Sequence, residues 1–205
     1  MNGFTYEFND RKEKLEKYEW DNVWWEHATH TGLTRVLYIG DSISCGTRRL
    51  ATEVANGALY FDGFGTSKAL DNPYLPDALL LFARQQGERR TIIFNNGLHG
   101  WHLDDTEQYP YYYEKTVKLL LDEFPDVPLA IVLTTSVADE QREARVIKRN
   151  EAAVRIAKKY ALPIIDLYSL SQSLLEYRKP DGVHFLSEGY TEFAKLIVNE
   201  VKKII

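Results

Sequence analysis

Three residue types that together make an activated nucleophile occur near the two ends of this sequence. Ser42 follows a glycine and an aspartate near the start, and Asp181 precedes His184 by three positions near the end. A serine hydroxyl is a weak nucleophile until a neighbouring base takes its proton, and that base must be oriented by a third group. Ser42, His184 and Asp181 supply these three types, so the sequence predicts a nucleophilic serine.

The residues around Ser42 have a second explanation, as the start of a helix. An apolar run at residues 36–39 leads directly into Gly40, Asp41 and Ser42. Such a run is typical of a strand buried on both faces, and Asp and Ser are frequent first residues of helices. Taken alone, the two interpretations are about equal. Asp181 and His184 favour the functional one, because α/β proteins place their sites at the carboxyl ends of strands.

Apolar runs and helical patterns alternate along the rest of the chain. We expect five strands, at residues 36–39, 58–61, 91–94, 129–133 and 163–166. We expect helices after Ser42 and at residues 78–84, 116–124, 140–160, 170–177 and 187–205. This alternation predicts an α/β fold with a parallel sheet and helices on both faces. Polar, glycine-containing stretches at residues 62–67 and 95–102 should be loops that open at the same edge as Ser42.

Length and composition favour one domain over residues 1–205, with residues 1–34 as an aromatic and charged extension that packs on it. Apolar residues make up 44% of the chain and charged residues 27%, which is an ordinary globular composition. The net charge of −5 argues against nucleic-acid and anionic membrane partners. No apolar run approaches transmembrane length and no secretory signal is visible. We therefore expect a cytoplasmic protein as the chain stands, or a secreted or periplasmic one if a signal has been removed.

Four short segments together resemble the sequence blocks of the SGNH, or GDSL-type, hydrolases. They are Gly40-Asp41-Ser42, the glycines near Gly65, Gly97-Leu98-His99, and Asp181-Gly182-Val183-His184. The resemblance spans nearly the whole chain. It implies a flavodoxin-like three-layer fold whose five parallel strands have the order 2-1-3-4-5. It also implies ester hydrolysis through an acyl-serine intermediate, without a cofactor.

The family resemblance also implies an oxyanion hole, formed by backbone N–H groups and one side chain. It assigns the backbone of Ser42 and of Gly65 to this hole, although the second block here is Gly-Phe-Gly where the family usually has Asn-x-Gly. His99 stands where the family has an asparagine. The third donor is therefore His99, or else Asn95 or Asn96 reaching in from the strand end.

The expected function is the hydrolysis of a small acyl ester. O-deacetylation of a carbohydrate suits the acidic, aromatic-rich chain, because aromatic faces stack on sugar rings; we assign Asp41 and Trp101 to substrate binding. A non-catalytic carbohydrate-binding relative and a lysophospholipase- or thioesterase-type acyl hydrolase are the alternatives. Two histidine pairs are spaced as metal ligands could be, but no third ligand accompanies either, so we expect no metal site.

Overall fold

The computed structural model describes residues 15–16, 18–85 and 88–205. Its strands are β1 (Asp21–Trp24), β2 (Arg35–Gly40), β3 (Tyr60–Thr66), β4 (Thr91–Phe94), β5 (Leu129–Val132) and β6 (Ile164–Ile165). Its helices are α1 (Ser42–Ala55), α2 (Leu75–Gln85), α3 (His102–Asp105), α4 (Tyr109–Glu123), α5 (Glu140–Lys159), α6 (Leu167–Gln172) and α7 (Ser187–Ile204), with a 3₁₀ turn at Leu175–Tyr177. The strands form one sheet, in the order β1-β3-β2-β4-β5-β6.

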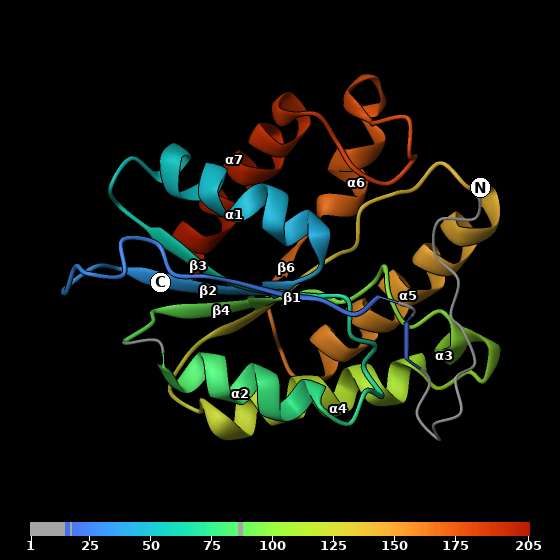
Figure 1. Ribbon diagram of the computed structural model, residues 1–205, viewed down its shortest axis with the longest axis horizontal. Coiled ribbons are helices and arrows are strands. Elements are labelled where there is room, and N and C mark those ends of the chain that lie inside the picture. Colours follow the sequence, from blue (N-terminus) through green and yellow to red (C-terminus); the bar gives the residue numbers. More distant parts are fainter. Residues whose placement is uncertain (1–14, 17, 86–87) are drawn as a thin grey trace.

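Helices cover both faces of this sheet (Figure 1). α1, α6 and α7 lie on one face, and α2, α4 and α5 lie on the other. Val36 and Tyr38 of β2 belong to the apolar core under α1 and α7, whereas Leu37 and Ile39 belong to the core on the opposite face. Side chains alternate between the faces of a strand, so β2 serves both cores and its apolar run is buried throughout. The expected three-layer α/β fold is confirmed.

The five parallel strands have the expected order, and a sixth strand is added at the edge. β3, β2, β4, β5 and β6 are successive parallel neighbours, which is the order 2-1-3-4-5. β1 pairs with β3 in the antiparallel sense and comes from the segment expected to be only an extension. Its four residues are all exposed. A strand of this length with no buried face does not show the apolar alternation that identifies a strand from sequence.

The glycines at residues 63 and 65 lie inside a strand and not in the expected loop. β3 continues through both of them to Thr66. A Cβ atom at Gly63 would lie 2.3 Å from Cδ of Arg48, and one at Gly65 would lie 2.3 Å from Sγ of Cys45. The glycines therefore allow α1 to approach the sheet closely.

α4 begins at Tyr109, earlier than the expected start at residue 116, because the rings of Tyr109 and Tyr113 are buried in the core. In the part of the chain that the structure describes, no helix has the length and apolar character needed to cross a membrane.

Candidate active site

The end of β2 and the start of α1 fix the position of Ser42. Ser42 is the first residue of α1, and the carboxylate of Asp41 caps this helix by accepting the N–H of Ile43 at 3.0 Å. β2 is held between β3 and β4, so its end has little freedom. The N–H groups of a helix N-terminus are available to a negative charge that develops beside the serine.

A tight loop before α7 brings His184 to Ser42. Nε2 of His184 lies 2.8 Å from Oγ of Ser42, and its Nδ1 lies 2.9 Å from Oδ2 of Asp181. Oδ1 of Asp181 accepts the backbone N–H groups of Val183 and His184, both at 2.8 Å. Gly182 has a φ of +75°, which a side chain would disfavour, and so allows the turn. The structure thus joins the three residues expected to act together.

The charge of Asp181 is stabilised within this loop. Burial alone would raise the pKa of the carboxyl group, but hydrogen bonds from the backbone of His184 and Val183 and from the His184 ring outweigh it and lower the pKa. Asp181 is therefore ionised at neutral pH and accepts the Nδ1–H of His184. Nε2 is then left with a lone pair that faces the Ser42 hydroxyl, so this arrangement can remove the serine proton.

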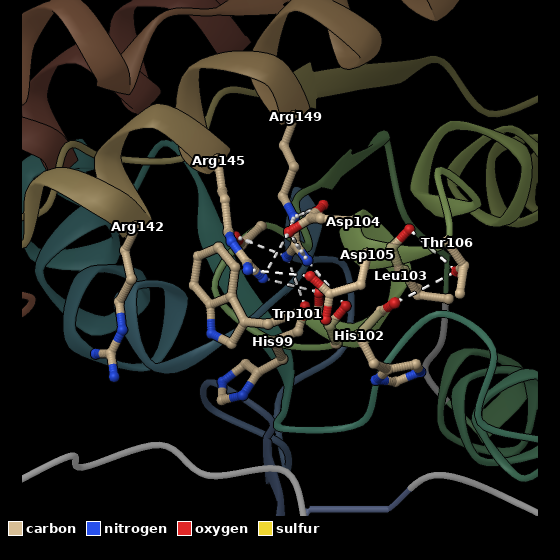
Figure 2. Close-up of polar contacts among 12 residues, drawn as sticks. His99, Trp101, His102, Leu103, Asp104, Asp105, Thr106, Arg142, Arg145 and Arg149 are labelled. Carbon is tan, nitrogen blue, oxygen red and sulfur yellow. Dashed lines mark hydrogen bonds and ion pairs between the residues drawn. The ribbon is translucent and has the colours of Figure 1, made fainter.

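The loop after β4 is held by a buried arginine of α5 (Figure 2). The Arg149 side chain is 1% exposed. It donates to the carbonyl oxygens of Gly97, His99 and Gly100 at 3.1, 2.6 and 2.8 Å. Asp104 balances its charge, with Oδ1 at 2.9 Å from Nε. One guanidinium group therefore holds three carbonyl groups of this loop in place.

The side chain of His99 is on the other side of this loop and reaches the candidate site. His99 and Ser42 line the same small cavity, about 10 Å³ in volume, together with Leu98, Trp101, Val137, Arg142 and Val183. Nδ1 of His99 lies 2.8 Å from Oε1 of Glu16, which comes from the segment before β1. Figure 2 shows the His99 ring turned away from the Arg149 guanidinium.

The two asparagines considered as alternatives to His99 are engaged elsewhere. The amide nitrogen of Asn95 donates to the Val132 carbonyl at 2.9 Å and to Oγ1 of Thr134 at 3.0 Å. The amide nitrogen of Asn96 donates to the Lys68 carbonyl at 3.1 Å. Both amides therefore tie the strand end to neighbouring backbone, and of the three candidates it is His99 that lines the cavity beside Ser42.

The remaining predicted residues differ in how well their positions suit a site. Gly65 is in register with Gly40, and a Cβ atom there would lie 3.5 Å from the Asp41 carbonyl, so its backbone adjoins the start of α1. Asp41 is 0% exposed and its carboxylate serves as a helix cap, and substrate binding by this residue stays a prediction. Trp101 lines the cavity but is largely buried, so it is a wall and not an open stacking surface.

His99 and His102 are turned to different carboxylates, whereas His27 and His30 stack on each other. Nε2 of His102 lies 2.8 Å from Oδ2 of Asp71, and the rings of His27 and His30 stack with centroids 5.4 Å apart. Within residues 15–16, 18–85 and 88–205, no group of three His, Cys, Asp or Glu side chains is arranged to hold a metal ion.

Sequence reasoning missed Glu16 and Arg149, because charged stretches are typically solvated. The side chain of Glu16 is only 10% exposed, and nothing local in the sequence indicates its distant partner. For Arg149 a signal exists. It lies three residues after Val146 and four before Ala153, both buried, so it falls on the core-facing side of α5.

Comparison with known proteins places this geometry in context. No family model matches the chain, and no curated protein matches it in sequence. The acetyl xylan esterase AlAXEase has a similar structure, with a TM-score of 0.62 at 17% identity, covering 82% of this chain and 99% of that one. A member of the lipolytic G-D-S-L family from Veillonella parvula has a TM-score of 0.59 at 17% identity, covering 84% and 98%.

A third similar structure is the C-terminal catalytic domain of peptidoglycan O-acetyltransferase A from Streptococcus pneumoniae, determined with a methylsulfonyl adduct. Its TM-score is 0.62 at 18% identity, covering 84% of this chain and 92% of that one. The chain therefore has the fold of GDSL-type proteins, as its sequence blocks indicate.

Proposed function

We propose that the chain is a serine esterase that removes a small acyl group, acetyl above all, from a carbohydrate or a related alcohol. The observation that carries the proposal is the line of hydrogen bonds from Ser42 through His184 to Asp181. Its place at the carboxyl edge of the sheet, at the start of α1, is where this class of fold positions reacting groups. The acetyl xylan esterase among the similar structures supports the choice of ester.

The reaction uses these residues in two steps. Oγ of Ser42 attacks the carbonyl carbon while its proton passes to Nε2 of His184. Backbone N–H groups of Ser42 and Gly65, with the His99 side chain, receive the charge of the oxyanion. The His184 imidazolium then protonates the departing alkoxide as its C–O bond breaks, leaving acyl-Ser42. In the second step, neutral His184 takes a proton from water, which attacks the carbonyl carbon of this ester. His184 then gives this proton to Oγ of Ser42 as the acyl–serine C–O bond breaks, which releases the acid and restores the free serine.

The cavity beside Ser42 supports a short acyl group. Its volume of about 10 Å³ is close to the minimum for one water-sized group. The side chains of Leu98, Val137 and Val183 close it, and each is buried. An acetyl methyl group suits this space, whereas a long acyl chain would require these side chains to move. The cavity therefore favours an acetylesterase over a lysophospholipase-type enzyme.

A non-catalytic carbohydrate-binding protein is the second candidate, and the observation in its favour is the histidine in the third sequence block. Retention of the 2.8 Å contact between Ser42 and His184 argues against it, because a binding protein has no need of an activated hydroxyl.

Hydrolysis of p-nitrophenyl acetate, butyrate and octanoate and of acetylated xylo-oligosaccharides tests the proposal. We expect acetyl esters to be preferred and Ser42→Ala to lose at least about 10⁴-fold in kcat. Ser44→Ala is the matched control, since Ser44 lies in the same helix but bonds to the Asp41 carbonyl. A sulfonyl fluoride should add its mass to the wild type and not to Ser42→Ala. Hydrolysis that survives Ser42→Ala would refute the proposal.

A further inference from the structure

The ring of His99 contacts a carboxylate from the N-terminal part of the chain, 83 positions away. Oε1 of Glu16 lies 2.8 Å from Nδ1 of His99, and the two side chains are 10% and 3% exposed. An ionised carboxylate only accepts hydrogen bonds, so this contact requires a proton on Nδ1. A neutral imidazole with its proton on Nδ1 has a lone pair on Nε2. In that form Nε2 would repel an oxyanion, and only the doubly protonated ring can donate there.

Two described carboxyl groups lie close to the His99 ring. Glu16 approaches it from the N-terminal segment, and Asp41 lies near it at the cap of α1. Burial raises the pKa of the Asp41 carboxyl, and the charge of His99 is the largest influence that opposes this rise. Oδ2 of Asp41 is buried, and the N–H groups of Ile43 and Gly97 and the charge of His184 also favour its ionised form.

Three described side chains that can carry positive charge also lie near His99. Arg142 lines the same cavity as His99, and His184 contacts Ser42, which also lines it. Arg149 reaches the backbone oxygen of His99 and is itself paired with Asp104. Among the described residues, the carboxyl groups of Glu16 and Asp41 thus act on the His99 ring in a site with little water, where electrostatic attraction is strong.

We propose that Glu16 is a positioning residue that keeps His99 as an imidazolium, so that its Nε2–H stabilises the acyl oxyanion. The inference rests on the proposed esterase function. Charge-assisted hydrogen bonds are about twice as strong as neutral ones. His99 keeps both protons throughout the reaction, while the Ser42 proton travels to His184 and then to the leaving alkoxide. The third sequence block therefore uses a charged donor where the family has a neutral amide.

This arrangement requires the two histidines of the site to hold opposite charge states. His184 must be neutral to accept the serine proton, and His99 must be charged to donate to the oxyanion. We expect kcat/KM to fall on both the acid and the alkaline side, because a protonated His184 cannot accept the serine proton and a singly protonated His99 cannot donate to the oxyanion. The pH profile of p-nitrophenyl acetate hydrolysis should therefore be bell-shaped.

Ring ¹⁵N NMR of the labelled protein tests the charge state without any turnover. Both ring nitrogens of His99 should carry protons at pH 7, with the signals identified by their absence from His99→Asn. Glu16→Gln should remove one of these protons. A His99 with a single ring proton at pH 7 would overturn the inference even in an active esterase. A charged His99 in a protein without esterase activity would overturn the proposed function and, with it, the oxyanion role.

Kinetics separate positioning from a structural role of Glu16. Glu16→Gln should lower kcat about tenfold, a part of what one oxyanion donor supplies, with little change in KM. It should also remove the alkaline fall, because a glutamine amide can donate to Nδ1 and leave a neutral Nε2–H. Glu123→Gln is the control, since the Glu123 carboxylate lies on α4 and accepts from Arg84 at 2.6 Å; its profile should match the wild type.

The same substitution in a second background completes the test. In His99→Asn, Glu16→Gln should change kcat by no more than about twofold, as expected for residues that no longer interact. Equal losses in the wild-type and His99→Asn backgrounds would show that Glu16 only supports the fold, and would refute the inference.

Discussion

The hydroxyl of Ser42 and Nε2 of His184 are 2.8 Å apart, so we expect the two residues to act as one catalytic unit. Each alanine substitution should lower kcat by about 10⁶-fold, and the double variant should be little worse than either. Asp181→Asn should lose less, since an asparagine oxygen can still accept the N–H groups of Val183 and His184. Turnover of p-nitrophenyl acetate measures all four variants; multiplicative losses in the double variant would contradict this prediction.

The side chains of His99 and Asn95 should differ in what their loss affects. His99→Ala should lower kcat by about 10²-fold with little change in KM, and His99→Asn should recover part of this, because an amide can donate. Asn95→Ala should instead lower the free energy of unfolding by about 1–3 kcal/mol, because it leaves the buried Val132 carbonyl unpaired. A collapse of kcat in Asn95→Ala, with His99→Ala near wild type, would reverse the assignment.

At the scale of elements, the cap of α1 couples the active-site helix to pH. Burial raises the pKa of Asp41 above 3.8, and the charge of His99 and the N–H of Ile43 offset this only in part. The folded protein therefore binds this proton more tightly than the unfolded chain. The contribution of Asp41 to stability is present below about 3.8 and is lost as pH rises through the raised pKa.

Asp41→Asn keeps an oxygen that can accept the N–H of Ile43, but it carries no charge. Its free energy of unfolding should therefore rise relative to the wild type between about pH 4 and about pH 7. Urea unfolding at the two pH values measures the difference, with Asp41→Ala as the control that also loses the cap, at about 1 kcal/mol. A constant difference between Asp41→Asn and wild type would show that burial does not perturb this carboxyl.

The packing of α5 against the loop after β4 depends on Arg149. The guanidinium lies over the rings of Trp101 and Tyr109, with centroids at 4.2 and 4.3 Å. Arg149→Met leaves the Asp104 carboxylate with only the longer contact to Arg145, at 3.8 Å, and removes the donor to three loop carbonyls. We therefore expect a loss of about 3–5 kcal/mol in the free energy of unfolding. Arg155→Met, at an exposed position of the same helix, should change it by no more than about 0.5 kcal/mol. Similar denaturation midpoints for both variants would contradict this role.

The elements that sequence predicts well are those whose own residues reflect burial. β2 is a continuous apolar run, and α5 and α7 have helical periodicity over many residues, so their positions follow from local pattern. β1 is four exposed residues long, and its pairing with β3 depends on distant chain. The glycines of β3 mislead in another way. In the sequence they suggest a loop, but in the structure they lie in a strand, where the close approach of α1 requires them.

The candidate site shows the same division. Ser42, Asp181 and His184 could be selected because their types and their places after a strand and before a helix define a chemistry. The contact of Glu16 with His99 spans 83 positions in the chain, and no local pattern reflects such a pairing. The choice among His99, Asn95 and Asn96 likewise depends on which side-chain amides already donate to neighbouring backbone carbonyls in the folded protein.

At the scale of the whole molecule, one buried ion pair fastens the segment after β1 to the sheet. Nη1 of Arg35 lies 2.9 Å from Oδ1 of Asp62, and the side chains are 10% and 0% exposed. The guanidinium also donates to the carbonyls of Glu26, His27 and His30, and Asp62 accepts the N–H of Glu26 at 2.7 Å. The N-terminal segment is therefore joined to β2 and β3 by side chains as well as by strand pairing.

Removing one partner of this pair should cost far more than removing both. Asp62→Ala leaves the Arg35 charge buried, so the free energy of unfolding should fall by about 3–5 kcal/mol. The double variant Arg35→Met/Asp62→Leu leaves no charge and should lose less than Asp62→Ala. Asp21→Ala is the control, because its pair with Lys68 is more exposed; loss of this pair and of the 2.7 Å hydrogen bond from Thr66 should together cost no more than about 2 kcal/mol. If urea unfolding gave Asp62→Ala and Asp21→Ala similar midpoints, the pairing of β1 with β3 would be what holds the N-terminal segment on the sheet.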